Sequence, residues 1–105
     1  FNAPLDADAG GAEFRAAMNN KILPALRAFR PDIVFVSAGF DAHARDPLAS
    51  LRLEESDFEW ATIRLQEIAG EYADGRLIST LEGGYDLEAL SSSVQAHAGA
   101  LSAAD

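Results

Sequence analysis

The sequence predicts an α/β fold, a three-layer α/β/α arrangement in which helices cover a parallel sheet. Two short apolar runs, 32–37 and 76–81, are separated by one helical pattern, and further helical patterns precede and follow them. A strand–helix–strand unit of this kind closes with a right-handed crossover, which makes its two strands parallel. The 105 residues suffice for one domain at most, and a hydrophobic content of 49% is typical of a globular chain.

The first helix is expected over 12–29. Arg30-Pro31 should end it, since the residue before a proline avoids helical geometry. Asp8 is the candidate N-terminal cap. Pro24 lies inside the helix and has no amide proton to donate to Asn20, so we expect a kink there. Apolar residues recur at three- and four-residue spacing and form one stripe: Phe14, Met18, Ile22, Leu26 and Phe29.

The first strand is expected over 32–37, where the sequence is continuously apolar from Ile33 to Val36. Such a run is typical of a strand that is buried on both faces, usually in a parallel sheet. A polar loop, 38–47, follows it, and the second strand, 76–81, ends before a glycine pair. Because two strands are too few for a stable sheet, we expect self-association of the chain to cover an open edge.

The second helix is expected to begin at Ser56, which fits a capping box with Glu59, and to stop at Asp74-Gly75. Its buried face would comprise Phe58, Ala61, Leu65, Ile68 and Tyr72. Trp60 lies off this stripe, and we interpret it as a contact with a part of the protein outside this chain or with a partner. The third helix opens at Asp86 and carries one apolar side: Leu87, Leu90, Val94, Ala98 and Leu101.

The composition disfavours several functional classes. A formal charge of −9 would repel nucleic acid and anionic membranes. No apolar run approaches the ~20 residues that a membrane span needs. The absence of cysteine excludes disulfides and thiolate metal sites and is compatible with a reducing compartment, so we expect a cytoplasmic protein. The chain opens with Phe1 rather than methionine, which suggests a fragment or a processed product.

Chemistry is expected where the two strands end, because ligands of parallel α/β sheets bind there. Asp41 follows the first strand and 83–85 follows the second, so both loops should emerge at the same edge. Asp41, His43 and Asp46 are candidate metal ligands, since carboxylate and imidazole suit zinc. The commoner role of such residues is to cap amides in a solvated turn, and Asp46 next to Pro47 is typical of turn chemistry.

The Gly83-Gly84 pair has two interpretations. It makes room for a ligand to which the Tyr85 hydroxyl donates, or it forms a tight strand-to-helix turn with Tyr85 on the surface. A phosphate site at the helix that follows is disfavoured because Asp86 and Glu88 would repel the anion. His97, in the last helix, is interpreted as structural.

Three segments together resemble the histone deacetylase superfamily, which includes histone deacetylases, acetylpolyamine amidohydrolases and acetoin-utilisation proteins. The longest is PDIVFVSAGFDAH, 31–43, which continues into Asp46-Pro47-Leu48. The second is LEGGY, 81–85, and the third is Asn2-Ala3-Pro4-Leu5. Their order and spacing agree with the family across almost the whole chain. The resemblance implies an arginase/deacetylase-like fold, of which 1–105 would be the C-terminal part of a single domain.

The resemblance also implies roles for individual residues. Asp41 corresponds to the aspartate that ligates the catalytic zinc. Tyr85 corresponds to the tyrosine that hydrogen-bonds the substrate carbonyl and the tetrahedral oxyanion. His43 receives no ligand role. The implied reaction is hydrolysis of an acetylated amine, acetyl-lysine or acetylpolyamine, to acetate and the free amine. The remaining implied site residues lie beside the acyl-lysine channel or in its wall: Gly83, Gly84, Pro47 and Leu48.

The sequence departs from the family in what it lacks. A complete enzyme has an upstream Asp-x-His with two further zinc ligands and a His-His pair that acts as general base and acid. Neither is present in these 105 residues, which contain two histidines in all. One carboxylate is too few for a zinc site, so we expect the chain alone not to deacetylate. Two alternatives are a non-catalytic interaction module and an arginase-type metal hydrolase, for which Asp41-Ala42-His43 is a poor match to Asp-x-Asp clusters.

Overall fold

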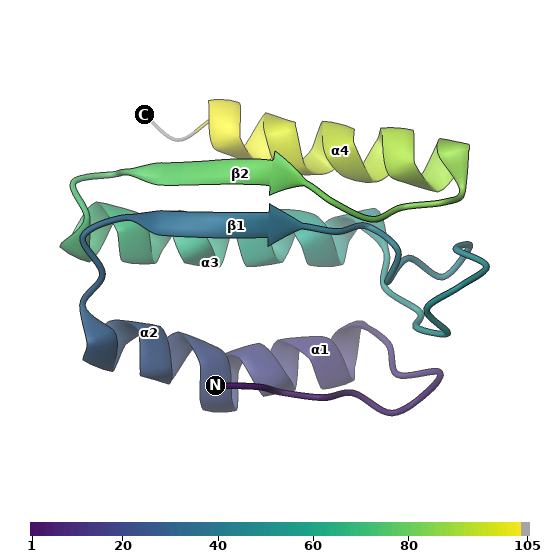
Figure 1. Cartoon of the computed structure of the whole chain (residues 1–105), viewed down its shortest axis with the longest axis horizontal. Coiled ribbons are helices and arrows are strands. Elements are labelled where there is room, and N and C mark those ends of the chain that lie inside the picture. Colours follow the sequence, from purple (N-terminus) through teal and green to yellow (C-terminus); the bar gives the residue numbers. More distant parts are fainter. Residues whose placement is uncertain (104–105) are drawn as a thin grey trace.

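The computed structural model describes residues 1–103, which form helices packed against a small sheet (Figure 1). Along the chain the elements are α1 (Gly11–Ala17), the π-helical turn η1 (Met18–Ile22), α2 (Leu23–Phe29), β1 (Val34–Ala38), α3 (Glu55–Tyr72), β2 (Leu77–Leu81) and α4 (Leu87–Ser102). The expected order of helix, strand, helix, strand, helix is therefore confirmed. Among residues 1–103, none of the helices has the length and apolar character that crossing a membrane requires.

The strands β1 and β2 are parallel neighbours joined by α3, as the βαβ prediction requires. Their Cα partners run in step from Val34 opposite Leu77 to Ala38 opposite Leu81. Both strands point the same way in Figure 1, so their carboxyl ends meet at one edge of the sheet. This edge is where the candidate site is found.

The helices of residues 1–103 cover one face of the sheet. Val34 and Ala38 point into that face and are buried. Phe35 and Ile78, which pair across the opposite face, are 67% and 49% exposed. The first strand was expected to be buried on both faces, but within residues 1–103 helices cover only one of them and Phe35 on the other face is exposed. The α/β class and the parallel unit are confirmed as a partial fold.

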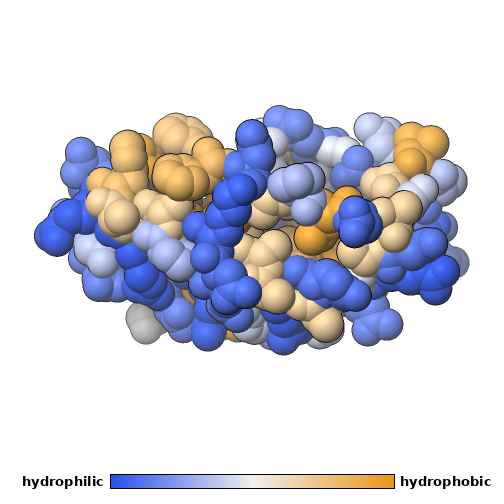
Figure 2. Space-filling view, turned by 90° about the horizontal axis from the view of Figure 1, so that it is seen from below, coloured by the Kyte–Doolittle hydropathy of each residue, from blue (hydrophilic) through white to orange (hydrophobic). Residues whose placement is uncertain are grey.

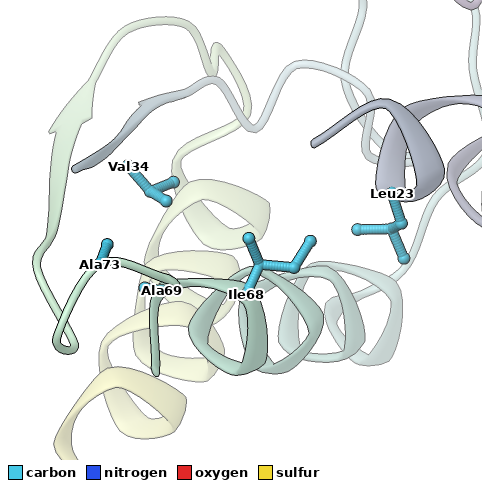
Figure 3. Close-up of a cluster of buried hydrophobic side chains, with 5 residues drawn as sticks. All are labelled: Leu23, Val34, Ile68, Ala69 and Ala73. Carbon is cyan, nitrogen blue, oxygen red and sulfur yellow. The ribbon is translucent and has the colours of Figure 1, made fainter. Parts of the chain in front are cut away.

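The main apolar cluster joins the covered face of β1 to α2 and α3. Figure 3 shows Val34 from the strand and Leu23 from α2 on either side of Ile68, whose side chain is fully buried. Ala69 and Ala73 complete the cluster. Because Ile68 lies between the strand and α2, burial of this one side chain links three elements.

The predicted helix 12–29 is helical nearly throughout, but it is not one regular α-helix. Its middle turn is the π-helical segment η1, where the Leu23 amide donates to the Met18 carbonyl five residues earlier. Pro24 then lies in the first turn of α2, where a missing amide proton is tolerated. The helix is therefore irregular just before the proline, as a π-helical turn, and the kink expected at Pro24 stays a prediction.

The predicted cap of this helix, Asp8, was wrong. Gly10 is the N-cap residue, and its amide donates to the Glu13 carboxylate at 3.1 Å. Asp8 instead has a left-handed backbone with φ of 67° and donates its amide to the Ser50 carbonyl. Asp8 therefore belongs to the preceding loop.

The second predicted cap was also wrong, whereas the third was correct. Helix α3 begins after Glu54, whose amide donates to Asp57 Oδ2 at 2.9 Å, so Ser56 lies inside the helix. Asp57 provides the bond that the sequence pattern attributed to Glu59. At α4, the Asp86 carboxylate accepts from the Ala89 amide at 2.9 Å, as an N-cap should.

Trp60, which the sequence assigned to a contact outside the chain, has partners within it. Its ring packs edge-on against Phe14 of α1, with centroids 6.3 Å apart. The Arg15 guanidinium lies 5.2 Å from the centre of the Trp60 ring. Trp60 therefore packs α3 against α1. This contact explains why it lies off the apolar stripe of α3.

Candidate active site

The loops that leave β1 and β2 lie side by side at the carboxyl edge of the sheet. Beyond the strands, the Phe40 amide donates to the Gly83 carbonyl at 2.8 Å, and the Glu82 amide donates to the Ala38 carbonyl at 3.0 Å. These bonds extend the parallel pairing into the loops. The convergence expected from the sequence, of Asp41 with the Gly83-Gly84-Tyr85 turn, is therefore present.

The Asp41 carboxylate rests directly against the backbone of Gly83. A Cβ atom at position 83 would lie 2.9 Å from the Asp41 carboxyl carbon, closer than side chains tolerate. A Cβ at Gly39 would lie 3.1 Å from Asp41 Oδ1. Within residues 1–103, no group donates a hydrogen bond to this carboxylate, so its oxygens are available to a metal ion.

His43 is held by two partners and is unavailable as a ligand. Its Nδ1 accepts a hydrogen bond from the Arg45 amide at 3.0 Å, so Nε2 carries the proton and donates to the Glu55 carboxylate. The His43 side chain is buried. The hydrogen bond from His43 holds the pKa of Glu55 below its usual value. An Asp41–His43 chelate is thus absent from this arrangement.

Asp46 ties the two loops together. Its Oδ1 accepts from the Leu48 amide at 2.9 Å, which closes a local turn of the kind expected beside Pro47. Its Oδ2 accepts from the Tyr85 amide at 2.8 Å, 39 residues along the chain. Sequence reasoning identified the turn and missed the bond to Tyr85, because nothing local in either loop indicates it.

The glycine turn has steric reasons for both of its glycines. Gly83 makes room for Asp41, and Gly84 has a φ of 144°, a conformation that favours glycine. A Cβ at position 84 would lie 2.8 Å from Leu90 Cδ1. The structure therefore shows a tight strand-to-helix turn in which Asp41 occupies the space beside Gly83, and a hydrogen bond from Tyr85 to a ligand stays a prediction. Tyr85 is 57% exposed at the edge of the sheet, and Pro47 and Leu48 are exposed on the neighbouring loop.

His97 lies behind this edge in a buried polar network. Its Nδ1 bonds Thr62 Oγ1 and its Nε2 bonds Ser79 Oγ, both at 2.7 Å. Thr62 donates its own proton to the Phe58 carbonyl, so His97 Nδ1 is the donor to Thr62 and Nε2 accepts from Ser79. Burial lowers the pKa of His97. Both ring nitrogens are used within the fold, which is the structural role expected for His97.

Comparison with known proteins decides what this edge belongs to. The family model described as the histone deacetylase domain matches residues 1–101. This chain belongs to the histone deacetylase family. The conclusion agrees with the resemblance carried by 31–43 and 81–85, and it favours the deacetylase over the arginase-type alternative.

Two similar proteins carry the name of the same family. Histone deacetylase 10, chloroplastic, of Oryza sativa subsp. japonica is 48% identical over 94 residues, which cover 90% of this chain and 21% of the relative. The histone deacetylase-like amidohydrolase of Pseudomonas aeruginosa is 42% identical over 85 residues, covering 81% of this chain and 22% of the relative. The chain thus spans about a fifth of the length of these relatives.

The fold also matches solved structures of histone deacetylases. The HD domain of HDA15 matches with a TM-score of 0.84 and 32% identity, covering 91% of this chain and 26% of that one. The histone deacetylase Clr3 matches with a TM-score of 0.83 and 33% identity, covering 91% of this chain and 16% of that one. The α/β arrangement at the carboxyl edge is therefore the arrangement of a deacetylase domain.

Among the three candidate metal ligands of this histone deacetylase family member, one has a carboxylate without a hydrogen-bond donor in residues 1–103. Asp41 is suitable as a ligand because its carboxylate is accessible and accepts no hydrogen bond within the described residues. His43 and Asp46 have their polar atoms engaged elsewhere. Among residues 1–103, no group of three or more acidic, histidine or cysteine side chains could hold an ion. Asp41 therefore fits as one ligand of a site that other residues must complete.

Proposed function

We propose that this chain is part of a zinc-dependent deacetylase that hydrolyses N-acetyl amides, such as acetyl-lysine or acetylpolyamine, to acetate and a free amine. Asp41 would contribute one zinc ligand, and Tyr85 would donate a hydrogen bond to the substrate carbonyl. The observation that carries the proposal is the contact of the Asp41 carboxylate with the Gly83-Gly84-Tyr85 turn at one edge of a parallel sheet.

Each residue has a role that its surroundings support. Zinc, when bound, supplies a Lewis acid that polarises the amide carbonyl and acidifies a bound water. The Asp41 carboxylate is available to it because no hydrogen bond within residues 1–103 competes. The exposed Tyr85 hydroxyl would stabilise negative charge on the carbonyl oxygen as the amide is attacked. The remaining proposed contacts to substrate are Gly83, Gly84, Pro47 and Leu48.

The isolated chain should not deacetylate. One carboxylate is fewer than the three protein ligands of a catalytic zinc site. We expect no zinc-dependent release of acetate from an acetyl-lysine peptide by the pure chain. Measurable release that disappears with a chelator would contradict this part of the proposal.

A segment exchange tests the proposal as a whole. The matched segment of the Pseudomonas aeruginosa amidohydrolase is replaced by this chain, and acetate release from an acetyl-lysine peptide is measured with zinc present. We expect the chimera to retain zinc and to hydrolyse the peptide, and Asp41→Ala to lose zinc. Asp32→Ala, at the opposite end of β1, removes one charge and serves as the control.

The second candidate is a non-catalytic interaction module. It is favoured by the engagement of His43 and Asp46 in structural bonds, which leaves Asp41 alone. The same chimera separates the two functions. A folded chimera that retains zinc yet releases no acetate would support the module and contradict the deacetylase.

A further inference from the structure

The Gly83-Gly84 pair raises the question of what holds Tyr85 in place. Two glycines in succession give the backbone unusual freedom immediately before this residue. The Tyr85 side chain is 57% exposed, and within residues 1–103 its hydroxyl forms no hydrogen bond. The segment is anchored on one side by the bond from Phe40 to Gly83 and on the other by the Asp86 cap of α4. Tyr85 itself contributes its amide, which donates to Asp46 Oδ2 at 2.8 Å.

We propose that Asp46 is a positioning residue: its carboxylate holds the Tyr85 amide and thereby sets where the Tyr85 hydroxyl lies relative to Asp41. The proposal rests on the proposed function for its catalytic meaning. Its geometric basis is independent of that function, since the 2.8 Å bond joins the loop that follows β1 to the loop that follows β2.

Asp46 is itself held rigidly. Its amide donates to the His43 carbonyl at 3.0 Å, and its Oδ1 accepts from Leu48. His43 is in turn fixed by the Arg45 amide and by Glu55 at the start of α3. The buried His43 imidazole therefore supports the loop at this edge without being a metal ligand. It orients the turn that presents Asp46 to Tyr85.

The chemistry of the contact requires a carboxylate. The Leu48 and Tyr85 amides are both donors, and an ionised carboxylate offers an acceptor oxygen to each. An asparagine has one acceptor oxygen and would leave one amide facing its NH₂ group. Hydrogen bonds to a charged acceptor are also stronger than those to a neutral one.

The first experiment uses the 105-residue chain itself and needs no activity. Amide hydrogen exchange is measured by NMR in the native chain, Asp46→Ala, Asp46→Asn and the Asp32→Ala control. In Asp46→Ala we expect the Tyr85 and Leu48 amides to exchange about 10–100-fold faster, with α3 unchanged. In Asp46→Asn one of the two should stay protected. An unchanged Tyr85 exchange rate in Asp46→Ala would overturn the proposal.

The second experiment uses the chimera and tests action through Tyr85. We expect Asp46→Ala to lower kcat by about tenfold or more, within the ~10²–10³ typical of losing an oxyanion donor. Zinc content and KM should stay close to those of the unsubstituted chimera. In a Tyr85→Phe background, Asp46→Ala should cause no further loss, because the group that it positions is gone.

These outcomes distinguish a failure of the positioning role of Asp46 from a failure of the proposed function. Losses from Asp46→Ala and Tyr85→Phe that multiply would show that Asp46 acts independently of Tyr85, and this would overturn the positioning role. An inactive unsubstituted chimera would contradict the proposed function. The exchange rate of the Tyr85 amide would then still decide whether Asp46 holds Tyr85.

Discussion

At Gly83 a single missing methyl group determines whether the site can form. The Asp41 carboxylate occupies the space where a Cβ atom would be, so an alanine must displace either the carboxylate or the strand end. The sequence indicated that this glycine turn brings the backbone close to something. It placed the Asp41 loop at the same edge, but it did not indicate that the Asp41 carboxylate itself packs against Gly83, 42 residues later.

Gly83→Ala should therefore lower zinc retention in the chimera and destabilise the isolated chain by about 1–3 kcal/mol, through overpacking. Gly99→Ala is the matched control, because nothing lies within 4 Å of its Cβ position on the exposed side of α4. That change should raise stability by up to about 1 kcal/mol by improving helix propensity. Urea unfolding measures both, and equal effects at the two positions would argue against the packing of Asp41 on Gly83.

His97 predicts how stability depends on pH. Burial lowers the pKa of His97, so the folded state binds this proton less readily than the unfolded state. Its contribution is fully present above the unfolded value of about 6.5 and is lost as pH falls toward the folded pKa. Urea midpoints measured from pH 7.5 to 5 should therefore decrease, with a shallower decrease in His97→Gln. Identical slopes in the two chains would contradict the buried neutral imidazole.

At the level of elements, the βαβ unit was predictable and the helix starts were only partly so. The strands and helices follow from apolar patterns that lie within one segment, and Asp86 caps its own helix from local sequence. At the start of α3, Asp57 accepts a hydrogen bond from the Glu54 amide and also binds Arg15 of α1 at 3.0 Å, a partner 42 residues away. Local patterns cannot show such a partner. For the same reason, the helical pattern did not indicate that Trp60 packs against Phe14 of α1.

The start of α3 gives a direct comparison between the sequence pattern and the structure. Asp57→Ala should destabilise the chain by about 1–3 kcal/mol, because the Glu54 amide and the Arg15 side chain lose their acceptor. Ser56→Ala should change stability by less than about 0.5 kcal/mol, since that exposed side chain caps nothing. If thermal unfolding shows that Ser56 is the costlier position, the helix begins where the sequence pattern put it.

Over the whole molecule, the described residues leave two apolar surfaces open. One is the sheet face that carries Phe35 and Ile78. The other lies over α2 and is formed by Phe1, Ile22, Leu26 and Phe29; Figure 2 shows apolar side chains gathered at that end. The apolar run of the first strand predicted apolar side chains on both faces of the sheet. It did not indicate which face the helices of this chain cover.

We predict concentration-dependent self-association through the sheet, because a two-stranded sheet leaves unpaired edges beside a bare apolar face. Sedimentation velocity should show a larger species at high concentration. Phe35→Thr with Ile78→Thr should shift it toward monomer, whereas Phe29→Ser should not. A native chain that remains a folded monomer at every concentration would count against this expectation.

In the proposed function, Tyr85 of this chain is the oxyanion donor opposite a zinc ligand. The most direct test of this role is the rate of acetate release by the zinc-loaded chimera compared with its Tyr85→Phe variant. We expect a rate about 10²–10³ lower in the variant, with the same zinc content. Equal rates at equal zinc content would contradict it.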